Sequence, residues 1–366
     1  MNKKNSIVVG SFLIFLMISM SGCLDSFTLP GGGVTYEEHP TKVQYTLRFG
    51  YMVNCSGLGE YEINYDCDIP ELVKGTLSYN LLYDSDYTQT QLANNNIIRW
   101  NVSGSGNKNY ELGIFANVTA QSFLVSDLNG ENALTLQDIQ TLHPDLVTQY
   151  CQDQIDSGTA YIESNNTFIK SSAQAVINQV DSNNSFLVAK GLFQWLKENT
   201  NYQIHIDDDS VQTAMKTYQI KTGDCDDLSF LYISLCRTVG IPARFIRGYL
   251  VEDVDGIINT VAHAWAEVFV GGDIGNDGWI PVECACTSEN CNVQIYQNFG
   301  IEDVGHLRLF TDDGSTESLN ASLSGPRVKY ESGLDVVMTA FVEIDDYSIL
   351  ESNELFINSE NQRAYT

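Results

Sequence analysis

This chain is short of basic residues. Its 366 residues include 19 lysines and arginines against 47 aspartates and glutamates, a net charge of −28 at pH 7. An acidic balance of this size argues against nucleic acid and against anionic surfaces as binding partners. Solubility in a salty exterior accounts for the charge without any charge-driven function.

Long apolar runs are also scarce, because only residues 7–20 come close to the length that a membrane span needs. Two lysines precede this run, which predicts a secretory signal over residues 1–22. Cys23 follows directly after Ser-Gly, which resembles a lipoprotein signal in which this cysteine is lipidated and becomes the first mature residue. An uncleaved anchor helix is the alternative. In both cases we expect an extracytoplasmic protein tethered to the cell membrane through residues 23–35.

The chain has nine cysteines. Cys23 belongs to the signal, Cys225 is a candidate nucleophile, and Cys236 falls on an apolar helical stripe and is expected to be a core thiol. An even set of six remains, which in an oxidising exterior suggests disulfides of open connectivity: Cys55, Cys67, Cys151, Cys284, Cys286 and Cys291.

Cys55 and Cys67 are poor candidates for a disulfide with each other. If residues 56–59 form a hairpin turn, Cys67 lies about seven residues along the returning strand, roughly 23 Å from Cys55. A disulfide needs α-carbons no more than about 7 Å apart, so this geometry disfavours the bridge.

The periodicity of the chain changes twice, which predicts an α+β protein. Residues 36–127 alternate apolar and polar side chains in short runs separated by turn residues, the pattern of an antiparallel β-sandwich. They carry no catalytic constellation, so we expect a spacer or binding role that the chemistry can do without. Residues 130–330 begin with helical periodicity and return to a period of two after residue 243, which predicts helices packed on an antiparallel sheet. A strand segment and tail occupy 331–366.

The candidate nucleophile stands at the start of a predicted helix. Residues 223–226 read Gly-Asp-Cys-Asp and lead into an amphipathic helix over 226–239. Free N–H groups and the helix dipole at such a position stabilise a thiolate, and the same N–H groups can bind an oxyanion. We therefore predict a lowered pKa for Cys225. Asp226 and Asp227 oppose this effect unless they face solvent.

A base and a carboxylate follow Cys225 along the chain. His263 lies between two alanines in a predicted strand, and these small neighbours leave room for its ring to approach Cys225. Glu283 ends a later strand, where its carboxylate could orient the imidazole. Nucleophile, base and orienting acid are the parts needed for acyl transfer through a thioester.

These residues belong to five sequence blocks that occur in a recognisable order: KTGDCDD (221–227), RTVGIPAR (237–244), GY (248–249), HAWAE (263–267) and GWIPV (278–282). With them, the stretch from about residue 172 to 310 resembles the transglutaminase-like superfamily, the papain-like fold of transglutaminases, certain cysteine peptidases and peptide N-glycanases. The resemblance implies Cys225 as nucleophile, His263 as base and residue 283 as third member of the site. The family usually has aspartate there, whereas this chain has Glu283, whose extra methylene moves the carboxylate by about one bond length.

Three cysteines follow Glu283 closely. We expect a disulfide that closes the 284–291 loop and holds Glu283 in place. A zinc site that uses these thiols with His306 is a weaker alternative, because CxxC spacing is lacking. His306 itself is expected to be a surface or structural residue, and no metal or cofactor is predicted.

The sequence therefore predicts a membrane-tethered, extracytoplasmic cysteine enzyme that acts on amide bonds. Its substrate would be a protein or a cell-surface peptide. Water as acceptor makes it a peptidase or amidase, and a lysine amine makes it a protein-glutamine acyltransferase. Hydrolysis is favoured because water needs no dedicated pocket. The alternative is a non-catalytic transglutaminase-like protein that serves as a surface binding or scaffold protein.

Overall fold

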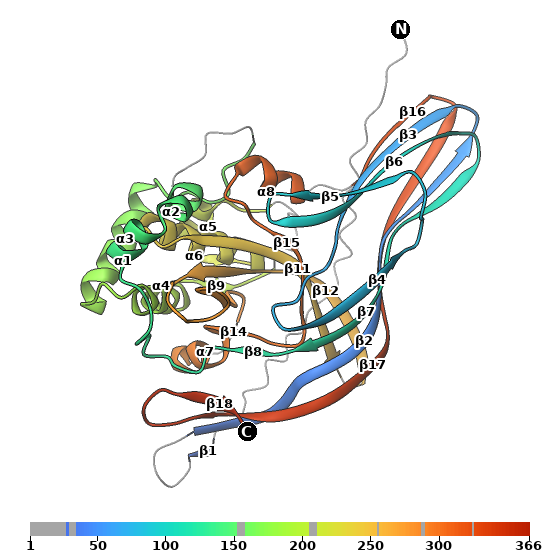
Figure 1. Ribbon diagram of the computed structural model, residues 1–366. Coiled ribbons are helices and arrows are strands. Elements are labelled where there is room, and N and C mark those ends of the chain that lie inside the picture. Colours follow the sequence, from blue (N-terminus) through green and yellow to red (C-terminus); the bar gives the residue numbers. More distant parts are fainter. Residues whose placement is uncertain are drawn as a thin grey trace.

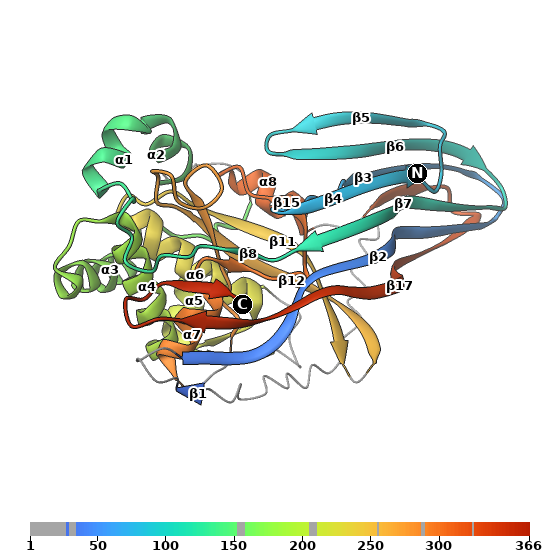
Figure 2. The same ribbon diagram turned by 60° about the horizontal axis from the view of Figure 1, so that its bottom comes forward.

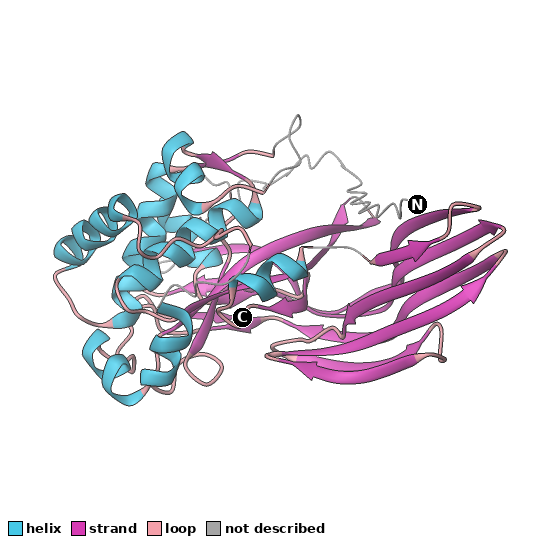
Figure 3. Ribbon diagram, turned by 90° about the horizontal axis from the view of Figure 1, so that it is seen from above, coloured by secondary structure: helices cyan, strands magenta, loops and turns pink. Residues whose placement is uncertain are grey.

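The computed structural model describes residues 27–28, 34–151, 158–204, 211–254, 256–286, 290–323 and 326–366. The predicted signal, Cys23 and most of the tether lie outside the described residues. In the part that is described, no helix combines the length and hydropathy needed to cross a bilayer. The fold mixes helices with antiparallel sheets, as the sequence predicts. Figure 3 shows the helices gathered at one end of the molecule and long strands at the other.

Two antiparallel sheets form the strand-rich end. The larger has the order β18-β17-β2-β7-β4, with β1 paired to β2. Its strands are β1 (Phe27–Thr28), β2 (Val34–Gly57), β4 (Gly75–Leu81), β7 (Lys108–Gln121), β17 (Leu334–Ile357) and β18 (Arg363–Tyr365). The smaller has the order β16-β3-β6-β5. Its strands are β3 (Glu60–Asp68), β5 (Tyr87–Leu92), β6 (Asn95–Ser105) and β16 (Arg327–Tyr330).

One hydrophobic core lies between these two sheets, because alternate residues of each strand point inward. On β2, Val43 and Tyr45 are buried while Gln44 between them is exposed. The inward residues share a core with Ile63 of β3 and Trp100 of β6. The alternating pattern that predicts the N-terminal sandwich therefore corresponds to a strand-rich region with two packed sheets.

The C-terminal strands complete the sheets that the N-terminal strands begin. β17 pairs with β2 from Leu334 opposite Gly57 to Ile357 opposite Val34. Figure 2 shows these two strands side by side from the helical end to the far end of the sheet. β16 pairs with β3 in the same way. The segment 331–366 is thus an integral part of the N-terminal sheet.

The helical end is built around a third antiparallel sheet, with the order β13-β12-β11-β15. Its strands are β11 (Ala243–Val254), β12 (Ile257–Phe269), β13 (Trp279–Val282) and β15 (His306–Thr311). Two short pairs join β9 (Asn201–Tyr202) to β10 (Thr222–Gly223) and β8 (Phe123–Leu124) to β14 (Ile301–Glu302). The helices are α1 (Leu136–Leu142), α2 (Pro144–Cys151), α3 (Thr167–Val180), α4 (Ser185–Asn199), α5 (Ala214–Ile220), α6 (Cys225–Thr238), α7 (Cys291–Asn298) and α8 (Thr316–Ser322).

Helix α6 is the central helix of this end, and Figure 1 shows it among the other helices beside β11 and β12. Its residues from Asp227 to Arg237 are all buried, so it contacts protein on every side. The sheet presents Ala264 and Ala266 of β12 to the core that contains α6. These small side chains let the helix approach the strand closely, which brings the first turn of α6 to the edge of β12.

Candidate active site

Cys225 is the first residue of α6, and Asp224 precedes it as the N-cap. The half-buried thiol reaches the edge of β12, where the backbone N–H of Ala264 hydrogen-bonds the sulfur. This edge is open because β13 pairs with β12 only from Ala266 to Phe269. The truncated pairing therefore leaves the backbone beside His263 free to receive the candidate nucleophile.

His263 lies on β12 and is only 5% exposed. Its Nε2 atom lies 2.7 Å from Oε2 of Glu283. A carboxylate can only accept hydrogen bonds, so Nε2 carries the proton and Nδ1 carries the lone pair. Among the described residues, none makes a hydrogen bond with Nδ1, although this atom is buried. His263 is therefore oriented by Glu283 and keeps one unoccupied proton acceptor.

Glu283 follows the end of β13 and uses both carboxylate oxygens. Oε1 accepts a hydrogen bond from the backbone N–H of Ala285 at 2.6 Å. Oε2 accepts from Nε2 of His263 at 2.7 Å and from Nε2 of His306 at 3.0 Å. Burial by itself would raise the pKa of the Glu283 carboxyl, but the two histidines outweigh burial and hold the pKa well below its usual range. Glu283 is thus ionised at neutral pH.

The sequence predicts a surface or structural residue at His306. The residue is buried, so it does not lie on the surface, and it belongs to the same cluster as His263 and Glu283. Its Nδ1 lies 2.8 Å from Oδ1 of Asp303, and its Nε2 contacts Glu283. The Trp265 ring packs against it edge-on, with ring centroids 4.8 Å apart. Burial lowers the pKa of His306, but Asp303 and Glu283 raise it well above the usual histidine value. No sequence block marks this residue; only the pairing of β15 with β11 brings it here.

The prediction of a lowered pKa for Cys225 is wrong. Burial, followed by the carboxyls of Asp226, Asp224 and Glu283, raises the pKa of the Cys225 thiol well above its usual value. The Ala264 N–H acts in the opposite direction but does not offset them. Cys225 is therefore a protonated thiol in the resting protein, and a base must remove its proton before it can attack.

The acidic residues around Cys225 do not simply face solvent. Asp227 is fully buried, and its carboxylate accepts hydrogen bonds from the backbone N–H and the side-chain amide of Gln212, both at 2.7 Å. The pKa of Asp226 is raised well above its usual value by burial and by a hydrogen bond with Asp224. Asp227 therefore fixes the chain before α5, while Asp226 hydrogen-bonds Asp224 beside the candidate nucleophile.

A buried ion-pair network supports the sheet behind His263. Trp265 Nε1 donates to Oε2 of Glu302 at 3.0 Å. Arg308 of β15 pairs with Glu302 and Glu267, and Glu267 also pairs with Arg244 of β11. This network explains the Trp and Glu of the HAWAE block, since both side chains satisfy buried charges that join β11, β12 and β15.

The predicted disulfide in the 284–291 loop is absent. All eight described cysteines are free thiols. Cys284 is fully buried in the hydrophobic core, and the thiol of Cys286 lies 3.0 Å from Oε1 of Gln294 instead of facing Cys291. Lys197 holds the start of the loop by donating to the carbonyls of Cys284 and Cys286. A lysine thus takes the place that we assigned to a disulfide.

Two groups of ligand-type side chains occur among the described residues, and neither combines the loop thiols with His306 as the zinc alternative requires. One group is Asp224, Cys225 and Asp226, in which the two aspartates hydrogen-bond each other. The other consists of His263, Glu283 and His306. Each histidine of this second group already donates a hydrogen bond to Glu283, and these bonds account for the short distances between the three residues.

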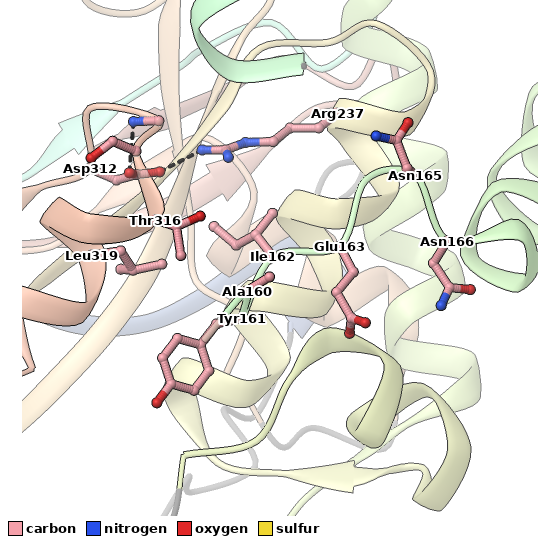
Figure 4. Close-up of a pocket in the computed structure, with 12 residues that line it drawn as sticks. Ala160, Tyr161, Ile162, Glu163, Asn165, Asn166, Arg237, Asp312, Thr316 and Leu319 are labelled. Carbon is pink, nitrogen blue, oxygen red and sulfur yellow. Dashed lines mark hydrogen bonds and ion pairs between the residues drawn. The ribbon is translucent and has the colours of Figure 1, made fainter. Parts of the chain in front are cut away.

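A separate cavity of about 290 Å³ lies near the other end of α6 (Figure 4). None of Cys225, His263 and Glu283 lines it. Arg237 reaches its wall, but the guanidinium already pairs with Asp312 and donates to the carbonyl of Ala243 at 2.7 Å. The cavity therefore offers no unpaired cation from Arg237 to a ligand.

A half-buried cysteine at a helix N-terminus, a histidine on the adjacent strand and a carboxylate behind that histidine resemble the arrangement of a papain-like cysteine site. Residues 171–284 match the family model of the Transglutaminase-like superfamily. The matched segment includes all three residues, so this part of the chain is a transglutaminase-like core.

Two curated relatives match short segments of the chain. The uncharacterized protein YebA of Bacillus subtilis is 30% identical over 76 residues, which is 18% of this chain and 10% of YebA. The uncharacterized protein ML0607 of Mycobacterium leprae is 28% identical over 100 residues, which is 26% of this chain and 34% of that protein. The matches therefore span only about a tenth and a third of these relatives.

Two solved structures align with much of this chain at low sequence identity. A protein from Cytophaga hutchinsonii, described as a proposed cysteine protease, is 13% identical, with a TM-score of 0.49 over 90% of this chain and 99% of that chain. The periplasmic domain of TgpA from Pseudomonas aeruginosa is 12% identical, with a TM-score of 0.35 over 71% of this chain and 94% of that chain.

Proposed function

We propose that the protein is a cysteine enzyme that acts on amide bonds through an acyl-thioenzyme. The observation that carries this proposal is the hydrogen bond from His263 Nε2 to Glu283 Oε2, which leaves Nδ1 as a buried proton acceptor. The sulfur of Cys225 accepts a hydrogen bond from the backbone N–H of Ala264, the residue after His263. This arrangement provides a nucleophile, a base and an orienting carboxylate in the order that acyl transfer uses them.

In the first step Nδ1 of His263 takes the proton of the Cys225 thiol while the sulfur attacks the carbonyl carbon of the amide. Backbone N–H groups at the start of α6, such as that of Cys225 itself, would stabilise the oxyanion that forms. The His263 imidazolium then gives its proton to the leaving nitrogen, the C–N bond breaks, and an acyl-thioenzyme remains. Because Glu283 is ionised and hydrogen-bonded to Nε2, it favours the imidazolium at this stage.

In the second step His263 removes a proton from the acceptor as the acceptor attacks the thioester. Water as acceptor releases a carboxylic acid and restores the thiol, which is peptidase or amidase chemistry. A lysine amine as acceptor forms a new amide, which is acyl transfer to a protein. We favour water, because it needs no binding pocket of its own.

The proposed setting is the outer side of the cell membrane. The pattern of residues 1–23 supports export and attachment through lipidated Cys23. The acidic chain supports a protein or cell-surface peptide as substrate and not a nucleic acid. The alternative proposal is a non-catalytic surface binding or scaffold protein, and the raised pKa of Cys225 is the observation that favours it.

Intact-mass spectrometry with an activated acyl donor, such as a p-nitrophenyl ester of an N-acylated glutamine peptide, tests the proposal. We expect one acyl adduct on Cys225 that decays in water, and faster decay with an added lysine analogue if transfer occurs. Cys225→Ala should abolish the adduct. Cys291→Ser, which removes another partly exposed thiol, should leave it unchanged. A folded protein that forms no adduct would favour the scaffold alternative.

A further inference from the structure

His306 differs from His263 in the number of its partners. Both ring nitrogens of His306 face carboxylate oxygens, Asp303 Oδ1 at 2.8 Å and Glu283 Oε2 at 3.0 Å. Carboxylates only accept, so each nitrogen must carry a proton if both hydrogen bonds are made. His306 is then an imidazolium. His263 shares the same oxygen of Glu283 but has only that one partner among the described residues, and it can remain neutral.

We propose that His306 is a positioning residue for the candidate active site: a permanent cation, held by Asp303, that fixes Glu283 and tunes the base strength of His263. This inference rests on the proposed role of His263 as the base that deprotonates Cys225. It extends the site to five residues in a row: Cys225, His263, Glu283, His306 and Asp303. In this proposal His306 and Asp303 act through Glu283 and do not contact the substrate.

The position of Glu283 supports the first half of the proposal. Its Oε2 lies between the two imidazole rings, and its Oε1 accepts from the Ala285 backbone. Three donors therefore hold one carboxylate from three directions. Removal of the His306 donor would leave only the His263 and Ala285 donors and loosen the side chain, which is 14% exposed.

The distance between the two rings supports the second half. The ring centroids of His263 and His306 are 5.5 Å apart. A cation on His306 therefore disfavours a second cation on His263 and reduces the pull of the Glu283 charge on the His263 proton. The His306 cation and the Glu283 carboxylate therefore act on the His263 proton in opposite directions.

The other charged groups nearby agree with a cationic His306. Glu252 of β11 faces both histidines, and its pKa is raised by burial and by Asp303 and Glu283, while the histidines act to lower it. His39 of β2 faces Asp303 and acts to lower the pKa of that carboxyl. The groups that surround His306 are thus three carboxyls, its partner His263 and the uncharged ring of Trp265.

Histidine NMR tests the protonation state directly. The chain has only five histidines, so full-length protein labelled with ¹⁵N-histidine gives few ring signals to assign. We expect His306 to show two protonated ring nitrogens at neutral pH, and His263 to show the neutral form protonated at Nε2. A neutral His306 at pH 7 would overturn the proposal. This readout does not depend on catalysis, so it stands even if no acyl-enzyme forms.

Variants then test the effect on His263, measured in a Cys225→Ala background to remove the thiol. His306→Gln keeps a donor for Glu283 but removes the cation, and the titration midpoint of His263 should rise because a nearby positive charge is lost. Asp303→Asn should lower the midpoint of His306 toward its ordinary value. The control is Asp312→Asn, which breaks a buried ion pair with Arg237 elsewhere and should move neither histidine.

A folded His306→Gln variant with an unchanged His263 midpoint would contradict the tuning role. If that variant does not fold, Asp303→Asn decides the question, because the Asp303 side chain is 47% exposed and tolerates substitution better. In that case a folded Asp303→Asn variant whose His306 stays doubly protonated would overturn the proposal. In the protein with its thiol, the pH profile of Cys225 alkylation by iodoacetamide should shift in the same direction as the His263 midpoint.

Discussion

Gly248 of β11 lies directly against Leu307 of β15: a β-carbon at residue 248 would sit 1.8 Å from the carbonyl oxygen of Leu307. The register between the two strands shifts at this point, between Arg247 and Gly248. This close approach sets the position of β15 and therefore of His306, which lies opposite Leu250. The glycine of the GY block is thus required by strand packing.

Substitution of Gly248 by alanine should push β15 away from β11. We expect a loss of about 1–3 kcal/mol in the free energy of unfolding, the usual cost of overpacking. The hydrogen bond between His306 and Glu283 should weaken as well. Urea denaturation measures the first effect, and the ring NMR signals of His306 measure the second. An alanine variant with unchanged stability would mean that the strands separate at no cost.

Glu283→Gln should lower the rate of acyl-enzyme formation strongly, by about 100-fold or more, because an amide neither stabilises the imidazolium nor accepts from two histidine donors equally well. Glu283→Asp should be intermediate. Its shorter side chain keeps the charge but cannot reach both rings, which lie 2.7 and 3.0 Å from the present oxygen. Single-turnover acylation rates give the comparison. Equal and mild effects of both changes would exclude residue 283 from the site.

The pH dependence of thiol labelling should reflect the raised pKa of Cys225. Without its base, in His263→Ala, iodoacetamide labelling should have a midpoint above the value of about 8.5 for a free cysteine. Burial and the nearby carboxyls disfavour the thiolate, so the direction is upward. Mass spectrometry of the peptide that contains Cys225 follows the labelling. A midpoint well below that of free cysteine would show that the helix N-terminus dominates after all.

Acid should destabilise the fold through Glu267. Burial alone would raise its pKa, but Arg308 and Arg244 lower it to about 2 from an ordinary value of 4.5. The folded carboxyl holds its charge where the unfolded one binds a proton, so this stabilisation is complete above pH 4.5 and disappears as the pH falls toward 2. The contribution of Glu267 to the free energy of unfolding above pH 4.5 is about 3 kcal/mol. Urea denaturation of the wild type and of Glu267→Gln at several pH values checks it, since the variant should lack this contribution to acid sensitivity.

Removal of residues 34–127 should now be expected to prevent folding, contrary to the view that the chemistry can do without them. β17 would lose its partner β2. Val251 of β11 and Leu307 of β15, which belong to the core of the sandwich, would be exposed. A chain that starts near residue 130 should aggregate or lack a cooperative unfolding transition. A soluble, cooperative short chain with a reactive Cys225 would contradict this.

The sequence predicted well those features that are encoded locally. The helix after Cys225 and the strand at His263 follow from periodicity, and their order along the chain is enough to expect them, with Glu283, in one site. His306 could not be predicted, because its place depends on the pairing of β15 with β11 and on a register shift at Gly248. The pairing of β17 with β2 could not be predicted either, because no local sequence pattern indicates that residue 334 lies opposite residue 57.

Two further predictions failed because they depend on the surroundings of a side chain. A helix N-terminus favours a thiolate, but the pKa of Cys225 is decided by burial and by three carboxyls that only the folded chain brings together. The even number of cysteines suggested disulfides, but the number of cysteines does not tell where each thiol points in the fold. Cys284 points into the core and Cys286 toward Gln294.

The pairing of β2 with β17 has a consequence for the order in which the protein is made. β2 ends at Gly57 and its partner β17 begins at Leu334. One edge of β2 therefore stays unpaired until β17 has been synthesised. Contacts between such distant residues close late and slowly. The transglutaminase-like segment lies between these two strands in the sequence. The large sheet is therefore expected to be completed only after β17 has been synthesised.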